Sequence, residues 1–228
     1  MRERAVNLRD WEVSAALAGR LTMLVRPMVA RDHGDPTEWA EEGGVWHPLA
    51  DQIGRGLEST GPGVRCRFGQ PGDRLWGREA WMLARASRDC EGIVDDEIAW
   101  RGRAPKTDPR GKRLIDDWCL GYAADGGEGP WRSSTQMPRW AARVVLVVEA
   151  VRVVQAQQGL TEAEAEATGI ERVEIRHVDG GEVAGSLSYH HSLMRALRGS
   201  RSPSWRHHPW VWAAKVRWVE AAEKRGAA

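Results

Sequence analysis

The stretch Ala141–Val154 constrains the fold more than any other part of the sequence, because apolar residues fill both faces of an extended chain there. Val145 and Val147 fall on one face and Val144 and Leu146 on the other, since successive side chains of a strand point to opposite sides. A strand that is apolar on both faces must be covered on both faces. We therefore predict a sheet at the core of the protein, with this strand at its centre.

Shorter signals predict the elements around that strand. Asp10 is a good N-cap and Gly19 a good terminator for one helix, and Thr161 with Glu164 forms a capping box for another. Helices are expected at Trp11–Leu17, Glu162–Thr168 and Leu187–Leu197. Strands are expected at Leu21–Val25, Ile93–Trp100, Trp118–Ala123 and Pro209–Trp218, with a small hairpin at Val173–Gly185 about Asp179–Gly180. This mixture predicts the α+β fold class.

The chain of 228 residues suits one domain with its own core. Residues 28–66 and 82–120 are mixed or rich in Gly, Pro and charged residues, so we expect them to be variable, irregular excursions. Only Leu49–Leu57 suggests a helical turn in the first of them, and Ala104–Gly111 reads as a loop in the second. With a tail at 220–228, we expect a single domain over 1–228 that carries long loop insertions.

The net charge of the protein is too small to attract a charged partner to the molecule as a whole. The formal net charge is +1, from 33 basic and 32 acidic residues, so any basic surface must be local. Four of the basic residues are Lys and the rest are Arg, which suits forked contacts with phosphates and bases. A genome rich in Arg codons explains that bias equally well. The 13 Trp suit both a core and a stacking platform.

Several classes of protein are not expected. No window approaches the roughly 20 apolar residues of a membrane span, and the N-terminal residues lack the apolar region of a signal peptide. The three Cys form no CxxC, which argues against zinc and disulfides and fits a cytoplasmic protein. Adjacent His on a helix diverge by about 100°, so the C-terminal His residues predict no metal site. These are His177, His190, His191, His207 and His208. No cofactor is expected.

Phe68–Trp81 combines a tight turn with an amphipathic strand. Pro71–Asp73 is turn chemistry, in which Pro sets φ and Gly supplies a positive φ. After the turn, Trp76 and Arg78 fall on one face of a short strand and Glu79 on the other. A strand with large amphipathic groups on both faces is expected to line a cleft, together with Thr22, Arg26 and the segment Trp131–Trp140.

Glu79 is the best candidate in this strand for a functional carboxylate. If it lies near Arg26, it stays ionised and can act as a general base. The alternatives are a structural ion pair or an acceptor for the edge of a base.

The segment Trp131–Trp140 interleaves two Trp and two Arg with hydroxyls and an amide. Such a loop can stack on a flipped base, read the edge of that base through Gln136 or Ser133, and hold phosphate with Arg132. Its anchoring to the central strand would keep the loop rigid.

A second interpretation of the same loop is structural. Trp140 then plugs one end of the sheet, and Arg139 pairs with a carboxylate such as Glu79. The two interpretations are compatible, because a binding pocket requires a rigid support.

Several blocks in a fixed order carry a resemblance to a known family. They are Ala18–Thr22 followed by Arg26, Gly69–Trp76 with Arg78–Trp81, Met137–Ala141 and Pro209–Trp212. As a set, they resemble the phage and prophage proteins of the activating signal cointegrator homology (ASCH) type, which belong to the PUA-like superfamily. The resemblance implies a small, partly open β-barrel flanked by helices, with a cleft beside the first helix that binds or processes nucleic acid.

An amidohydrolase of that superfamily, which acts on acetylcytidine, uses a Gly-x-Lys-Thr-x-Thr-x-Arg stretch. Gly19, Thr22 and Arg26 match this pattern, but Leu21 stands in place of the lysine and Leu24 in place of the second threonine. The groups that activate the hydroxyl nucleophile are therefore missing. Whether the chain is an enzyme stays open.

Three functions remain in view. The first is a nucleic-acid-binding protein of phage origin that recognises a base, including a modified one, in DNA or RNA. The second is an enzyme acting on a modified base, a nucleoside or a strand, of the amidohydrolase or nuclease type. The third is a phage assembly scaffold. The residues expected to contact nucleic acid are Thr22, Arg26, Trp76, Arg78, Glu79, Trp131, Arg132, Ser133, Gln136 and Arg139.

Overall fold

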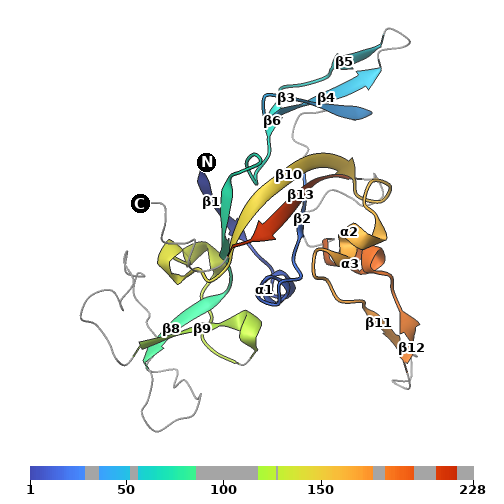
Figure 1. Ribbon diagram of the computed structural model, residues 1–228. Coiled ribbons are helices and arrows are strands. Elements are labelled where there is room, and N and C mark those ends of the chain that lie inside the picture. Colours follow the sequence, from blue (N-terminus) through green and yellow to red (C-terminus); the bar gives the residue numbers. More distant parts are fainter. Residues whose placement is uncertain are drawn as a thin grey trace.

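The computed structural model describes residues 1–28, 36–51, 56–85, 118–126, 128–176, 183–197 and 209–219. Over these residues the fold is α+β, as the sequence predicts. One five-stranded sheet, three smaller sheets and three helices make up the described chain. The five-stranded sheet lies at the centre, and the smaller sheets project from it as arms (Figure 1).

The central sheet has the strand order β1-β7-β10-β13-β2. Strands β1 and β7 are parallel, and the other neighbours are antiparallel. The five strands are β1 (Glu3–Asn7), β7 (Arg74–Arg78), β10 (Val145–Gln155), β13 (Trp210–Trp218) and β2 (Met23–Pro27). The sequence prediction of a central strand is confirmed, because β10 occupies the middle position.

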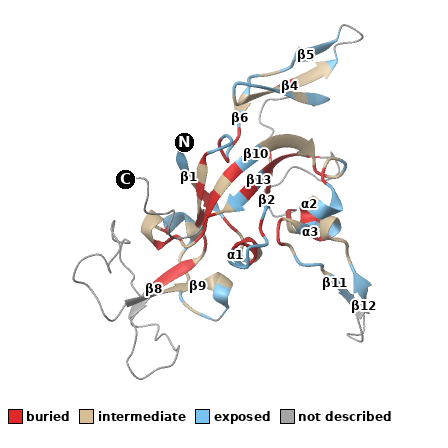
Figure 2. Ribbon diagram, in the orientation of Figure 1, coloured by how far each residue is buried: buried red, intermediate tan, exposed pale blue. Residues whose placement is uncertain are grey.

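Strand β10 is buried on both faces over its first half. Val145, Leu146 and Val148 are at most 1% exposed, and buried residues gather where the central strands cross the molecule (Figure 2). The next residue, Glu149, is exposed, and the register with β13 shifts between Val148 and Ala150. The strand therefore contributes to the core mainly through its first half.

The central sheet is open over the described residues, because its edge strands β1 and β2 do not pair through their backbones. A side chain joins them instead. Arg26 of β2 donates from Nη2 to the carbonyl oxygen of Asn7, the last residue of β1, at 2.8 Å. The described chain thus forms no closed barrel, but one guanidinium connects the two edges of its sheet.

Helix α1 (Asp10–Leu17) starts one residue earlier than a cap at Asp10 would place it, because Arg9 is the N-cap. The Glu12 carboxylate accepts from the Arg9 backbone N–H at 2.9 Å, which satisfies a group at the helix start. Gly19 follows the helix with φ +70°, as expected for a terminating glycine.

Helices α2 (Glu162–Glu166) and α3 (Tyr189–Leu197) confirm the other two helix predictions. The capping box is present, since Thr161 accepts from the Glu164 N–H at 3.2 Å and Glu164 accepts from the Thr161 N–H at 3.0 Å. Among the described residues, no helix is both long and apolar enough to cross a membrane.

The prediction that residues 28–66 form an irregular excursion is wrong for the described part of that stretch. It forms a four-stranded sheet of β3 (Glu38–Glu42), β4 (Val45–Asp51), β5 (Leu57–Ser59) and β6 (Val64–Arg65). Gly43 and Gly44, both with positive φ, make the two-residue turn between β3 and β4. Trp39 and Trp46 meet Trp210 and Trp212 edge to face, so contacts with the central sheet stabilise strands that look polar in the sequence. Leu49 lies in β4, and no described residue supports the helical turn expected there.

Two two-stranded sheets complete the described chain. Strands β8 (Trp81–Arg85) and β9 (Trp118–Tyr122) pair antiparallel, which confirms the second strand of residues 82–120. Strands β11 (Glu174–Arg176) and β12 (Val183–Ser186) confirm the predicted hairpin. Other predictions fall outside the described residues. These are the strand Ile93–Trp100, the loop Ala104–Gly111, the hairpin tip Asp179–Gly180 and the tail 220–228.

The turn before β7 is held by the buried carboxylate of Asp73. Its Oδ1 accepts from the Arg2 N–H at 2.7 Å and its Oδ2 from the Gln70 N–H at 3.2 Å. Burial alone would raise the pKa of this carboxyl, but these two donors and the nearby Arg4 guanidinium hold the pKa below its ordinary value. The turn is thereby fixed to strand β1.

We expect Asp73→Asn to lower the free energy of unfolding at neutral pH by about 1–3 kcal/mol, because two backbone donors lose a charged acceptor. The folded-state pKa lies below the unfolded value. The contribution of the carboxylate is therefore present above the unfolded pKa and is lost as the pH falls through the folded pKa. Urea denaturation should show the difference between wild type and variant shrinking from neutral pH down to about pH 3. A difference that stays constant over this range would contradict the assignment.

Candidate functional site

Strand β7 and the segment Trp131–Trp140 lie together, as the sequence predicts. The Trp81 N–H donates to the Arg132 carbonyl at 3.3 Å, and the Arg132 N–H donates to the Trp81 carbonyl at 2.8 Å. The Arg78 guanidinium donates to the Thr135 carbonyl at 3.4 Å. The end of β7, the start of β8 and the loop therefore lie together.

Trp76 is the centre of this surface. Its half-buried ring lies 5.5 Å from the guanidinium carbon of Arg78 and 5.9 Å from that of Arg139. The Nε atoms of both arginines are buried and have no hydrogen-bond partner among the described residues. We name the Trp76 face as Trp76, Arg78, Arg132, Ser133, Gln136 and Arg139.

Arg139 pairs with a carboxylate, as the structural interpretation of the loop expects, but the partner is Glu3 and not Glu79. Its Nη2 lies 2.6 Å from Glu3 Oε1, an exposed ion pair that links the loop to strand β1. An exposed pair of this kind is weak, and it leaves Arg139 only partly neutralised.

The loop of the Trp76 face contains two single-turn 3₁₀ segments, Ser134–Gln136 and Arg139–Ala141. Ser133 caps the first through a hydrogen bond between its Oγ and the Thr135 N–H at 3.4 Å, and Ser133 Oγ and Thr135 Oγ1 lie 2.9 Å apart. Ser133 and Gln136 are exposed. The loop thus carries hydroxyl and amide groups on a locally ordered backbone.

Trp81 anchors the loop from the interior of the protein. It is fully buried and meets the half-buried Trp140 edge to face, with ring centroids 6.3 Å apart. Arg132 lies over the Trp81 ring at 5.4 Å, and Trp131 is half-buried beside it in sequence. Trp140 therefore packs at the end of the sheet, in agreement with the structural interpretation, while the Trp76 face stays on the outside.

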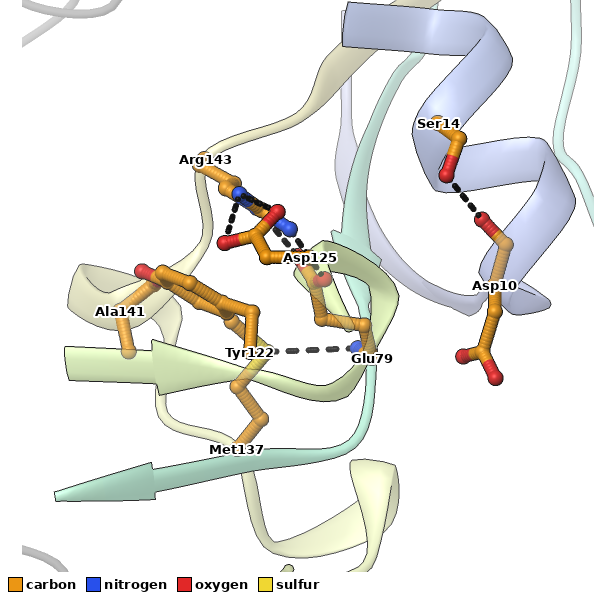
Figure 3. A network of polar contacts seen from close by, with 8 residues as sticks. All are labelled: Asp10, Ser14, Glu79, Tyr122, Asp125, Met137, Ala141 and Arg143. Atoms are coloured by element: carbon orange, nitrogen blue, oxygen red, sulfur yellow. Dashed lines mark hydrogen bonds and ion pairs between the residues drawn. The ribbon is translucent and has the colours of Figure 1, made fainter. Parts of the chain in front are cut away.

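Glu79 belongs to a buried ion-pair network and not to a free active site (Figure 3). Glu79 is 1% exposed, and both of its carboxylate oxygens accept from Arg143 at 2.9 Å. Arg143 also binds Asp125 and lies 4.0 Å over the ring of Tyr122. The Tyr122 hydroxyl donates to the Ala141 carbonyl at 2.8 Å, which extends the network to the loop.

The expected proximity of Glu79 and Arg26 is wrong, because Arg143 takes both oxygens of the carboxylate. Burial raises the pKa of Glu79, and the hydrogen bonds and charge of Arg143 oppose that rise without cancelling it. A general base needs a free lone pair directed at a substrate. With Arg143 across both oxygens, the geometry favours the structural ion pair over catalysis.

Arg26 lies in the interior and not on the Trp76 face. It is 8% exposed, and its two terminal nitrogens lie 2.5 and 2.6 Å from the oxygens of Glu12. Thr22 is exposed, but its backbone bonds place it beside Ala167 and Val216. The structure gives Arg26 a structural role, and a contact of either residue with nucleic acid stays a prediction.

No group of His, Cys, Asp and Glu suited to a metal ion occurs among the described residues. His190 and His191 are engaged with the Ala156 carbonyl and the Ser188 hydroxyl. His177, His207 and His208 lie outside the described residues.

Sequence reasoning missed Glu12 and Arg143, the partners of the two buried charges. Arg143 is 64 positions from Glu79, and no local pattern connects them. A usable signal was present for Glu12, since a Glu at the third position of a helix often accepts from the backbone at the start of that helix.

Comparisons of the chain with protein-family models, curated proteins and solved structures found no match.

We expect Arg26→Met to lower the free energy of unfolding by about 3–5 kcal/mol, because it leaves Glu12 as a buried charge without its counterion. The double variant Glu12→Leu/Arg26→Met removes both charges and should recover a large part of that loss. Urea denaturation of both variants and wild type checks this. A double variant no more stable than Arg26→Met would show that the charge pairing is not the cause.

Proposed function

We propose that this protein binds nucleic acid through the Trp76 face. The observation that carries the proposal is the half-buried Trp76 ring with the guanidinium groups of Arg78 and Arg139 lying over it. An aromatic ring stacks on a base of any sequence, and arginine contacts the adjacent phosphates.

The neighbouring loop adds groups that can recognise a base. Ser133 and Gln136 expose hydroxyl and amide groups on the loop whose Thr135 carbonyl accepts from Arg78, and the edges of bases are read by such groups. Because Trp81 and Trp140 hold the loop against the start of β8, these groups are positioned before a ligand arrives. A single base, including a modified one, in DNA or RNA is the proposed ligand.

The resemblance to ASCH proteins of the PUA-like superfamily supports the same proposal, and so does the phage setting that it implies. An open sheet whose edges are joined by the Arg26 side chain is compatible with a small, partly open barrel. Helix α1 lies beside that junction, where the resemblance expects a flanking helix. An enzymatic role through Glu79 is less well supported, because Arg143 occupies both of its oxygens.

Binding to fluorescent single- and double-stranded DNA and RNA at low salt tests the proposal, with normal and modified cytosines compared. We expect Trp76→Ala to weaken binding by about 5- to 100-fold, because one base loses its stacking partner. Trp76→Phe should retain most of the affinity. Arg78→Gln should reduce the salt dependence by the equivalent of about one phosphate contact.

Arg217→Gln is the matched control, because Arg217 is an exposed arginine on strand β13. It should leave binding and salt dependence unchanged. No measurable binding to any of these oligonucleotides, or equal binding by wild type and Trp76→Ala, would overturn the proposal.

A further inference from the structure

A cavity of about 180 Å³ lies at the other end of strand β7, where the chain turns before Arg74. The guanidinium-bearing residues Arg2, Arg4 and Arg65 line it, together with Cys66, Gln70 and Asp73. They come from three separate parts of the chain, which are β1 with the residue before it, the end of β6 with the residue after it, and the turn before β7. The fold therefore gathers three arginines around one small hollow.

The charge balance of this cavity is positive. Its single carboxylate, Asp73, is already engaged by two backbone N–H groups and lies 3.8 Å from Arg4 Nε. That Nε is buried and has no hydrogen-bond partner among the described residues. Burial raises the pKa of the Cys66 thiol to about 11, so it adds no negative charge at neutral pH. An anion with several oxygens is the ligand that such a cavity favours.

A larger hollow of about 510 Å³ adjoins the first, because Gly44, Gly69 and Gln70 line both. Trp46 and Val151 give it an apolar wall. Its carboxylate, Glu41, accepts from the Gly44 N–H at 2.6 Å and so is partly occupied. The combined cleft has a basic end and an aromatic end.

Gln70 forms the boundary between the two hollows. Its Nε2 donates to the Gly43 carbonyl at 3.3 Å, which fastens the β3–β4 turn to the turn before β7. A Cβ at Gly44 would lie 1.5 Å from that nitrogen, so glycine lets the two turns approach this closely. Edge-to-face contact with Trp212 holds Trp46 in place on the far side.

We infer that this cleft binds a nucleotide, with the phosphate among Arg2, Arg4 and Arg65 and the base toward Trp46. Guanidinium groups match the geometry of phosphate oxygens, and an indole wall suits a planar ring. The phosphate can belong to a free nucleotide or to the 5′ end of a strand. The inference does not depend on nucleic-acid binding at the Trp76 face, because the two sites share no residue.

Isothermal titration calorimetry of the full chain with nucleoside 5′-monophosphates tests the inference, with inorganic phosphate and the matching nucleosides as separate titrations. We expect saturable binding of at least one monophosphate, weaker binding of inorganic phosphate and the weakest binding of nucleosides. Arg4→Gln and Arg65→Gln should each weaken monophosphate binding by roughly 10- to 100-fold, because each removes a charged donor. Arg65 is exposed, so its variant keeps the test valid if Arg4→Gln fails to fold.

Arg20→Gln is the matched control, because Arg20 is exposed and lines a different cavity. It should bind as wild type does.

Tighter binding of a 5′-phosphorylated oligonucleotide than of its 5′-hydroxyl form, lost in Arg65→Gln, would identify a strand end as the source of the phosphate. Tighter binding of the free monophosphate would identify a free nucleotide.

Two results would overturn the inference. One is the absence of saturable monophosphate binding up to about 1 mM. The other is binding that Arg20→Gln weakens as much as Arg4→Gln and Arg65→Gln do, since that would reflect general charge. Failure of the Trp76 variants to affect oligonucleotide binding would contradict the function proposed for the Trp76 face and leave this result unchanged.

Discussion

The architecture depends on the buried ion pair between Glu12 and Arg26. Glu12 belongs to α1 and Arg26 to β2, and the same guanidinium reaches the Asn7 carbonyl at the end of β1. Three elements that are near in sequence thus meet through one side chain, which joins the two edges of the central sheet. Two charges taken out of water are stable only when fully paired, so this corner tolerates the loss of neither partner.

The second buried pair, Glu79 with Arg143, performs a related task at the end of β7. It fixes the chain where β7 passes into β8, and Tyr122 and Asp125 connect it to the end of β9 and the segment after it. Trp76 packs against the buried cluster that contains Trp81. Strong internal support and a half-buried outer ring are features of a preorganised binding surface.

The sequence predicted those elements whose signals are local. The central strand follows from apolar residues on both faces of β10, and α2 from the capping box of Thr161 and Glu164. The sheet of β3 to β6 was missed because its strands are largely polar, although Gly43 and Gly44 are a recognisable hairpin turn.

The candidate site divides in the same way between local and distant contacts. The meeting of β7 with the segment Trp131–Trp140 was predicted, since both carry large amphipathic groups. The partners of the charged residues were not predicted, because a Glu can pair with any of many Arg and only the folded chain selects one. In the folded chain, Glu79 pairs with Arg143 and Arg139 pairs with Glu3.

Strand β7 has a further consequence, because it runs between the basic cleft at Asp73 and the Trp76 face at Arg78. An extended strand rises about 3.3 Å per residue, so the Cα atoms of Asp73 and Arg78 are about 17 Å apart. The strand cannot slide, since the Leu8 N–H donates to the Arg78 carbonyl and a slip of one residue would exchange Leu75 and Trp76 between faces. It acts as a spacer of fixed length, and a molecule that reaches both surfaces must match that length.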